Sequence, residues 1–332
     1  MWLDVIIQWI KAFFGTVVFW TGIAGVLLVL ITMVRYRIRR GKASEKTNED
    51  SSNGTAGLMP NEDKHTRRIA LITGASSGIG RAFALRIDQT EKEIDEIWLV
   101  ARRQDKLVAL AGELQHDTLI IAADLTEGLD AEAYDNPLTR ALAGTAGDSG
   151  PVHIKILINA AGFAKIGNYA KVSFQDSMRM IDLNDKAAVA VTLVCLPYMK
   201  QGDRIIQMCS TAAFQPLQHI NIYGASKAFL YHYTRALRME LFPRKIAVTA
   251  VCPFWVKDTE FIGIAKDGTE ELPIRHFPFA TTAEKVAKRG LRASRAGWAV
   301  VTPGAFCVIH RFFTKLLPRE AAIWIWELMR RM

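Results

Sequence analysis

Cysteine is scarce in this sequence, and no metal-binding pattern is present. The 332 residues include only four widely spaced cysteines, none in a C-x-x-C pair: Cys195, Cys209, Cys252 and Cys307. The histidines show no ligand spacing either. We therefore expect no metal site and no disulfide framework. Thiols in apolar stretches suit burial in a reducing compartment.

Acidic residues are outnumbered, 33 against 42 basic ones, which gives a net charge of +9. That excess alone leaves nucleic acid, anionic lipid or a phosphorylated ligand open as partners. Hydrophobic residues make up 50% of the chain and charged residues 23%. This balance argues against a disordered chain and against a protein with many membrane spans.

One hydrophobic run is long enough to cross a membrane. Residues 12–34 carry no charge, and as a helix they would span roughly 34 Å, against a hydrocarbon core of ~30 Å. A cleaved signal peptide and a buried core helix are the alternatives. The chain start lacks the basic residues and the A-x-A-like site of a signal peptide, and soluble core helices are rarely this apolar. We predict an uncleaved, single-pass anchor within residues 1–40.

Basic residues cluster directly after this run, whereas only Lys11 precedes it: Arg35, Arg37, Arg39, Arg40 and Lys42. The positive-inside rule then predicts that everything after the anchor faces the cytoplasm. Residues 41–66 are almost entirely polar and read as a flexible linker. Residues 67–332 have the size of one catalytic α/β domain and contain no internal repeat.

Short apolar runs alternate with amphipathic segments throughout this domain. We predict strands at 69–73, 97–101, 118–122, 154–158, 204–209, 246–251 and 298–301. Residues 78–90 and 104–116 are examples of predicted helices. Continuous apolar strands separated by helices indicate a buried parallel sheet. The fold class is therefore α/β, a Rossmann-like doubly wound sheet preceded by one transmembrane helix.

A glycine-rich turn follows the first predicted strand and opens the first helix. It reads TGASSGIG over residues 73–80. Glycines let a backbone turn tightly and approach a pyrophosphate, which the helix N-terminus then faces. The position after a strand favours this interpretation over an ordinary turn.

A second pattern joins Ser210, Tyr223 and Lys227. Tyr and Lys four residues apart share one helix face, and an ammonium beside a phenol should lower the phenol pKa from ~10 toward neutrality. Ser210 follows a predicted strand, at the sheet edge where such folds bind ligands. Alone, this set would indicate only a surface pair and a capping serine. With the glycine turn it predicts a catalytic site.

These motifs resemble the short-chain dehydrogenase/reductase family in its compact single-domain form, over roughly residues 67–300. The matching positions are 73–80, Asp124-Leu125, Asn159-Ala160-Ala161-Gly162, Asn184, Ser210, and Tyr223 to Lys227. The order of segments, an anchor followed by a linker and then this domain, is similar to that of the membrane-bound hydroxysteroid and lipid-carbonyl reductases of the family. The motifs identify the family, whereas the shared architecture is weaker evidence about the substrate.

The resemblance implies a role for each matched residue. Tyr223 would exchange a proton with the substrate oxygen, Ser210 would position that oxygen, and Lys227 would tune Tyr223 and bind the nicotinamide ribose. Asn184 would complete the catalytic set by holding a water next to Lys227. The remaining cofactor contacts would come from Gly74, Ser76, Ser77, Gly78, Ile79, Gly80, Asp124, Leu125, Asn159, Ala160, Gly162, Pro253, Val256 and Thr259.

Cofactor choice depends on the residues after the second strand. An acid there suits the ribose 2′-hydroxyl of NAD, and an arginine suits the 2′-phosphate of NADP. Arg102 and Arg103 follow the strand at 97–101, and no acid precedes Asp105. We predict NADP(H), with Arg102 in the leading role and Arg103 or Ser76 assisting.

One segment departs from the family pattern. The family has Pro-Gly followed by a hydrophobic residue and threonine after the sixth strand, whereas Phe254 here replaces the glycine and Thr259 comes one position late. Large apolar residues gather around it, and Phe254, Trp255 and Phe261 are expected to line an apolar substrate pocket. The aromatic and basic C-terminal segment, 306–331, is consistent with either a subunit interface or a membrane-facing surface.

Two functions of different kinds follow. The first is a membrane-tethered, NADP(H)-dependent reductase of a hydrophobic carbonyl such as a steroid or other lipid, with a 3-oxoacyl thioester as a rival substrate. The second is a non-catalytic, cofactor-binding sensor or scaffold, which would be expected to lack Ser210, Tyr223 or Lys227. A homodimer or homotetramer is expected, and nucleic acid is not expected as a partner.

Overall fold

The computed structural model describes residues 66–129, 134–144, 151–267, 274 and 279–331. All of them belong to one unit of the chain, Lys64–Met332. The anchor predicted at 12–34 and nearly all of the predicted linker lie outside these residues. Within them, no helix is both long and apolar enough to cross a bilayer.

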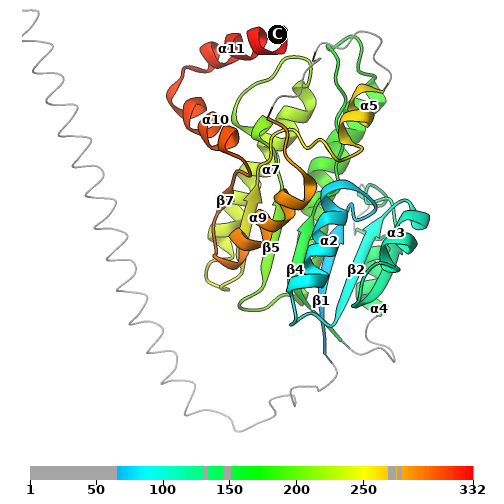
Figure 1. Ribbon diagram of the computed structural model, residues 1–332. Coiled ribbons are helices and arrows are strands. Elements are labelled where there is room, and N and C mark those ends of the chain that lie inside the picture. The colour runs from blue at the N-terminus through cyan, green and yellow to red at the C-terminus, as the bar shows by residue number, and fades with distance from the viewer. Residues whose placement is uncertain (1–65, 130–133, 145–150, 268–273, 275–278, 332) are drawn as a thin grey trace, which may run out of the picture. The chain divides into compact units, whose positions relative to one another are not determined.

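Seven parallel strands form a single sheet in the order β3-β2-β1-β4-β5-β6-β7 (Figure 1). They are β1 (Arg67–Thr73), β2 (Glu96–Ala101), β3 (Asp117–Ala122), β4 (Val152–Asn159), β5 (Arg204–Met208), β6 (Ala247–Val251) and β7 (Val300–Val301). The strand order reverses between β1 and β4, and ligands bind doubly wound sheets outside the carboxyl ends of the strands at that point. The predicted fold class is confirmed for the α/β domain.

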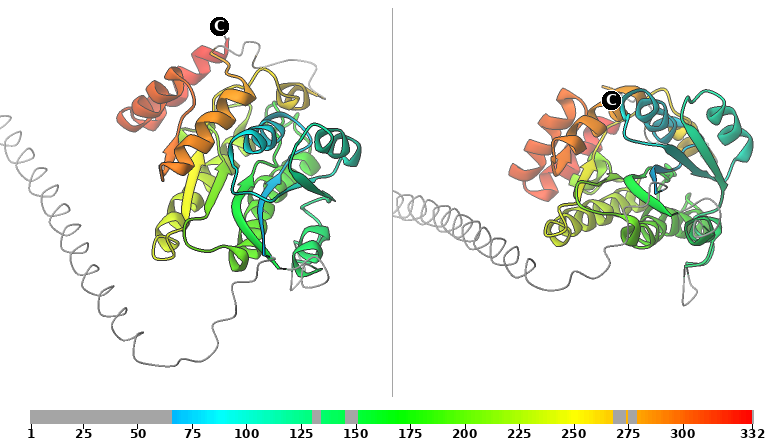
Figure 2. Two further views of the ribbon diagram at one scale, coloured as in Figure 1. Left: turned by 60° about the horizontal axis from the view of Figure 1, so that its bottom comes forward. Right: turned by 90° about the horizontal axis from the view of Figure 1, so that it is seen from below.

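Helices cover both faces of the sheet, as Figure 2 shows. On one face α2 (Gly78–Thr90), α3 (Gln104–Ala111) and α9 (Ala283–Arg295) pack over side chains such as Ile72 and Leu99. On the other, α4 (Pro137–Gly144), α6 (Ala187–Cys195) and α7 (Asn221–Glu240) pack over Leu71 and Leu157. The strands are apolar on both faces because both are covered.

The helix that enters α6 is not regular. α5 (Phe174–Ile181) continues through a π-helical stretch, η1 (Asp182–Lys186), directly into α6. Short 3-10 turns, η2 (Leu196–Tyr198) and η3 (Thr211–Phe214), follow α6 and β5. π-bulges of this kind are frequent at functional sites, and Asn184 lies inside this one.

Three helices cap the carboxyl edge of the sheet: α8 (Phe261–Lys266), α10 (Ala305–Leu316) and α11 (Arg319–Arg331). α10 and α11 form the C-terminal end of the domain (red in Figure 1). They are interrupted at Pro318, where a helix lacks a backbone donor. Trp326 of α11 is only 6% exposed, and its indole nitrogen donates to the Gln218 carbonyl at 3.2 Å.

Two predicted element boundaries are wrong. The helix predicted at 104–116 ends at Ala111, followed by Gly112, because the Asp88 carboxylate accepts the Gln115 and His116 backbone N–H groups at 2.9 Å. The strand predicted at 298–301 shortens to Val300–Val301, since the Trp298 N–H remains in a turn with the Ala293 carbonyl.

Candidate active site

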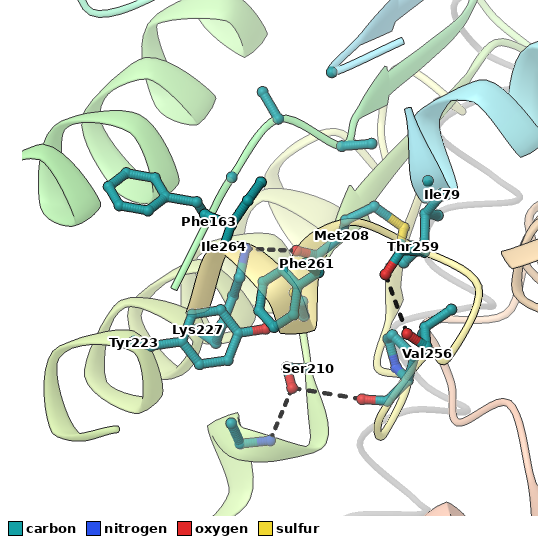
Figure 3. A pocket seen from close by; sticks show the side chains of 18 of the residues that line it. Ile79, Phe163, Met208, Ser210, Tyr223, Lys227, Val256, Thr259, Phe261 and Ile264 are labelled. Atoms are coloured by element: carbon teal, nitrogen blue, oxygen red, sulfur yellow. Dashed lines mark hydrogen bonds between the residues drawn. The ribbon is translucent and has the colours of Figure 1, made fainter. Parts of the chain in front are cut away.

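A cavity of about 580 Å³ opens at the carboxyl edge of the strands. Its wall is built from the glycine turn after β1, the loops after β2 to β6, and parts of α7, α8, α10 and α11. Figure 3 shows Ser210, Tyr223 and Lys227 inside this cavity, with Phe261 and Ile264 of α8 close by. The cavity thus gathers the cofactor motif and the Ser–Tyr–Lys pattern predicted from the sequence.

The glycine turn is packed too tightly for side chains. Gly74 and Gly78 have φ angles of +67° and +54°. A Cβ on Gly74 would lie 2.8 Å from the Ala161 Cα, and one on Gly80 would lie 2.2 Å from the Gly74 carbonyl oxygen. Because the turn is closed in this way, the N-terminus of α2 faces the cavity and can receive an anion. This geometry fits the pyrophosphate of a dinucleotide.

Hydrogen bonds hold the turn against the loop after β4. The Thr73 hydroxyl oxygen accepts the Ala160 and Ala161 N–H groups at 3.1 and 3.2 Å. Asn159 points away from the cavity rim, and its amide donates to the Thr192 hydroxyl of α6 at 2.9 Å. Asn159 therefore braces helix α6 against the sheet and does not line the cavity, in contrast to its predicted cofactor contact, whereas its neighbours Ala160 and Gly162 do line it.

Ser210, Tyr223 and Lys227 are all buried, with 7%, 8% and 5% of their surfaces exposed. The Lys227 ammonium donates to the Met208 carbonyl at 3.0 Å and lies 5.8 Å from the centre of the Tyr223 ring. The Ser210 hydroxyl oxygen accepts the Ala212 N–H at 3.1 Å, and the hydroxyl donates to the Pro253 carbonyl at 3.4 Å. The three side chains lie together as a polar cluster in the cavity wall.

Burial dominates the ionisation of this cluster. It raises the pKa of Tyr223, although the hydrogen bond from Ser210 acts in the opposite direction. Burial also lowers the pKa of Lys227. The expected lowering of the phenol pKa toward neutrality is therefore not found for the protein by itself, where desolvation has the largest effect. A protonated phenol is the form that a proton donor needs.

Asn184 is fully buried in η1 and connects two parts of the site. Its amide exchanges hydrogen bonds with the backbone of Phe163, at 3.0 and 3.1 Å, and donates to the Ser226 hydroxyl at 3.1 Å. A Cβ on Gly162 would lie 2.7 Å from the Asn184 side-chain oxygen and 3.4 Å from the Lys227 ammonium. Asn184 thus lies beside Lys227, and its holding of a water remains a prediction.

Two arginines mark the opposite end of the cavity. Arg103 donates to the Ser76 and Ser77 hydroxyls at 3.1 and 2.9 Å. Arg102 is more exposed and lies 3.7 Å from the Asp124 carboxylate. The structure places Arg103, not the favoured Arg102, directly against the glycine turn. Guanidinium groups next to hydroxyls in this corner fit a ribose 2′-phosphate.

Asp124 was expected to contact the cofactor, and it does line the cavity together with Leu125. Burial would raise its pKa, but hydrogen bonds from Thr126 and the charge of Arg102 outweigh that effect and lower the pKa. Asp124 is accordingly an anion whose position is fixed by its own loop.

The loop after β6 closes over the glycine turn. The Thr259 hydroxyl donates to the Val256 carbonyl at 3.1 Å, and its methyl group would lie 3.1 Å from a Cβ on Gly78. Pro253 accepts the Thr211 N–H through its carbonyl at 3.0 Å. Pro253, Val256 and Thr259 all line the cavity, so the late position of Thr259 still brings it to the cofactor motif.

Aromatic side chains form the other end of the cavity. The Phe261 ring lies 5.4 Å from the Tyr223 ring, and the Phe254 ring lies 5.7 Å from the Trp255 ring and 4.7 Å from the Phe306 ring. The three predicted substrate residues are therefore brought together. The sequence analysis missed the C-terminal contributors, which are Phe306, His310, Ile325, Trp326 and Met329.

His310 was not singled out in the sequence, although its spacing of four from Phe306 could have indicated a shared helix face. Its ring stacks on Phe306 at 6.0 Å, and burial lowers its pKa. His310 is therefore a neutral ring in the aromatic part of the cavity wall.

The sequence analysis also missed Glu260. Its carboxylate accepts a hydrogen bond from Arg103 and so joins the two ends of the cavity.

Comparison with known proteins agrees with this geometry. A family model described as short chain dehydrogenase matches residues 68–267. The chain is 34% identical over 207 residues to serine 3-dehydrogenase of Agrobacterium fabrum, which covers 60% of this chain and 76% of that protein. It is 32% identical over 206 residues to an NADP-dependent 3-hydroxy acid dehydrogenase of Salmonella typhi, covering 61% and 78%.

Solved structures give the same picture. A short-chain dehydrogenase from Sphingobium yanoikuyae in complex with NADPH aligns with a TM-score of 0.58 and 27% identity, over 75% of this chain and 94% of that chain. The closed form of a serine dehydrogenase complexed with NADP+ aligns with a TM-score of 0.56 and 28% identity, over 70% and 94%.

Proposed function

The chain belongs to the short-chain dehydrogenase family, and we propose that it interconverts a ketone or aldehyde with the corresponding alcohol on a hydrophobic, steroid- or lipid-like substrate. It is an oxidoreductase of this family. The observation that carries the proposed reaction is the buried cluster of Ser210, Tyr223 and Lys227 in the same cavity as the glycine turn.

The side chains divide the chemistry of carbonyl reduction among them. A nicotinamide cofactor held at the glycine turn would supply the hydride for the carbonyl carbon. Ser210 donates a hydrogen bond that positions the carbonyl oxygen, and Tyr223 gives that oxygen its phenolic proton. Lys227 stabilises the phenolate left behind, and alcohol oxidation uses the same groups in reverse.

We propose NADP(H) as the cofactor, with NAD(H) less favoured. Arg102 and Arg103 follow β2 where an NAD enzyme would carry an acid, and Arg103 contacts the serines of the glycine turn. The Salmonella typhi relative is named as NADP-dependent, and the two solved structures reported above contain NADPH or NADP+. The residues present therefore fit a phosphorylated ribose.

The substrate proposal depends on the C-terminal helices. The names of the curated relatives indicate small hydroxy acids, but the family match ends at residue 267. α10 and α11 lie beyond that limit and add Phe306, Ile325 and Trp326 to the cavity wall. The aromatic and aliphatic side chains that these helices add to the wall favour an apolar substrate. A 3-oxoacyl thioester remains the rival substrate.

We also propose that the enzyme is tethered to a membrane with its catalytic domain on the cytoplasmic side. The support is the uncharged run at 12–34 and the basic cluster after it. A second support is an unusual surface on α10 and α11, where large apolar side chains are about half or more exposed: Val308, Ile309, Phe312, Phe313, Leu316, Trp324, Ile325 and Leu328. We call these eight residues the C-terminal apolar face.

A bilayer suits the C-terminal apolar face better than water does. Arg311, Lys315 and Arg319 lie on the same two helices and complement anionic lipid headgroups. Ile325 belongs to both this face and the cavity wall, so an apolar substrate could pass from lipid into the cavity.

For subunit assembly we propose a homodimer or homotetramer, with exposed Leu193 and Met239 of α6 and α7 as contact points.

The experiment is a panel of hydrophobic ketones and alcohols tested with the full chain in detergent micelles and with both cofactors. NADPH-dependent reduction of at least one large apolar carbonyl, and its loss in Ser210→Ala, would support the proposal. Cofactor binding without turnover of any member of the panel would favour the non-catalytic sensor or scaffold instead. Selective turnover of 3-oxoacyl thioesters would favour the rival substrate.

A further inference from the structure

Three charged side chains, Arg103, Lys106 and Glu260, form a cluster between the two ends of the cavity. At one end is the proposed 2′-phosphate corner, formed by Arg103, Ser76 and Ser77, and at the other is the substrate end. Glu260 accepts a hydrogen bond from Arg103 at 2.8 Å and forms a second ion pair with Lys106. The other edge of the Arg103 guanidinium contacts Ser76 and Ser77. One arginine is thus shared between the glycine turn and the segment that leads into α8.

Glu260 immediately precedes α8, and its carbonyl accepts the Ile264 N–H at 2.9 Å. α8 carries Phe261, whose ring packs 5.4 Å from the ring of Tyr223. The carboxylate that meets Arg103 therefore also fixes the start of the helix that covers the catalytic tyrosine. No residue of the Ser–Tyr–Lys set takes part in this link.

The carboxylate remains charged at every pH at which the enzyme would work. Hydrogen bonds from Lys106 and Arg103 lower the pKa of Glu260 to about 2. Its side chain and those of both cations are 40% exposed. The cluster is thus an ion-pair network that solvent and salt screen in part. In this network an anion already neutralises much of the charge that a 2′-phosphate would meet.

We propose that Glu260 is a specificity-determining residue that moderates the affinity of the 2′-phosphate corner and, through the same ion pairs, holds α8 over Tyr223. A phosphate bound by Arg103 must share the guanidinium with the Glu260 carboxylate. Both groups are negatively charged, so the carboxylate repels the phosphate. Removing the negative charge leaves Arg103 and Lys106 for the phosphate and frees the start of α8. The proposal depends on the proposed function, since it takes NADP(H) as the cofactor.

The test is Glu260→Gln in the full chain in detergent micelles. Binding of 2′,5′-ADP and of 5′-AMP is measured by calorimetry, because the two nucleotides differ at the ribose 2′-position by the phosphate alone. We expect the variant to bind 2′,5′-ADP three- to tenfold more tightly and 5′-AMP within twofold of the parent, with a smaller difference at high salt. Lys106→Gln should weaken 2′,5′-ADP binding instead.

Glu113→Gln is the matched control, since it breaks an exposed ion pair with Arg81 at 2.6 Å and changes the net charge equally. It should leave both affinities unchanged. Hydrogen exchange supplies the second measurement, and amides over 261–266 should exchange several-fold faster in Glu260→Gln than in the parent.

Each outcome is decisive. Unchanged or weaker binding of 2′,5′-ADP to Glu260→Gln would overturn the specificity role, since the carboxylate would then only orient Arg103. Unchanged exchange over 261–266 would overturn the role in holding α8. A parent that binds 2′,5′-ADP no better than 5′-AMP would instead refute the proposed cofactor, which keeps the two failures distinguishable.

Discussion

The Lys227 ammonium lies 5.8 Å from the centre of the Tyr223 ring and donates its hydrogen bond to the Met208 carbonyl, not to the phenol. Burial disfavours the charged form of both groups, since it raises the pKa of Tyr223 and lowers that of Lys227. The arrangement keeps the phenolic proton on Tyr223 until the carbonyl oxygen of a substrate needs it.

Tyr223→Phe should abolish turnover while nucleotide binding stays close to that of the parent. The phenol is the proton donor of the cluster, and loss of general acid catalysis typically costs ~10²–10⁴ in rate. The glycine turn and the arginines are not touched by this change. The measurements are kcat with the best substrate of the panel and NADPH affinity by fluorescence. Activity within threefold of the parent would remove Tyr223 from the mechanism.

Arg103→Ala should reduce NADPH affinity more than Arg102→Ala does. Arg103 is held against Ser76 and Ser77, whereas Arg102 is 58% exposed and 3.7 Å from Asp124. A charge-assisted hydrogen bond contributes about 1.5–3 kcal/mol, or roughly ten- to 150-fold in affinity. NADH affinity should change little in either variant.

Arg102→Asp tests the arginine favoured by the sequence. An acid at this position repels a phosphate and accepts from a ribose hydroxyl, so the ratio of kcat/KM for NADPH to that for NADH should fall. An unchanged ratio in Arg102→Asp, with a large fall in Arg103→Ala, would assign the phosphate contact to Arg103 alone. A parent that prefers NADH would overturn the choice of cofactor.

The sequence predicted the chemistry of the site better than its boundaries. The glycine turn, Ser210, Tyr223 and Lys227 could be predicted because each depends on local geometry: a strand end, a turn or one helix face. Asn184 was predicted only from the family resemblance. Which of two adjacent arginines faces the turn depends on the exit direction of the chain after β2. That direction is set by tertiary packing, which no local pattern records.

The contribution of α10 and α11 to the cavity could not be predicted for a related reason. Trp326 reaches the site through a contact with Gln218 more than 100 positions earlier in the chain. The apolar pattern of 306–331 was equally consistent with a subunit interface or a membrane surface. Only the fold shows that one side of these helices faces the cavity while the other remains exposed.

Asp185 should make folding stability fall as the pH rises. Burial raises its pKa from 3.8 to about 7, although Lys227 acts in the opposite direction. Between these values the folded chain keeps a proton that the unfolded chain has lost, so the free energy of unfolding decreases with rising pH. After allowance for solvent screening, the loss is about 1–3 kcal/mol by pH 8.

Asp185→Asn should therefore raise the melting temperature at pH 8 by several degrees and change it little at pH 4. The control is Asp182→Asn, which removes a more exposed carboxylate from the same stretch, η1, where it pairs with Lys186 at 2.8 Å. Thermal unfolding of the full chain in detergent at both pH values provides the measurement. An Asp185→Asn variant that is destabilised at pH 8 would show that the carboxylate is ionised and needed there.

The anchor can be tested by extraction. Full-length protein should remain with membranes in alkaline carbonate, because the span at 12–34 inserts without charge. Replacing both Leu27 and Leu28 with arginine costs about 2.5–3.5 kcal/mol per residue at a helix centre and should release the protein. Protease digestion of sealed vesicles should cut the catalytic domain only from the cytoplasmic side. Parent protein in the carbonate supernatant would refute the anchor, and digestion from the opposite side would refute the orientation.

The C-terminal apolar face predicts a specific route for the substrate, from the bilayer into the cavity. Phe313 of α10 is 51% exposed, and Phe306 of the same helix lines the cavity, so one helix touches both lipid and the substrate space under this proposal. Phe313→Asp should raise KM for a bilayer-partitioned ketone several-fold in vesicles, because burying a carboxylate at the lipid surface is costly. KM for a short, water-soluble ketone should not change. Val108→Asp, on the 53% exposed Val108 of α3, is the matched control and should affect neither. Equal loss with both ketones would indicate a damaged cavity, and a change in oligomeric state with unchanged KM values would assign the face to a subunit contact.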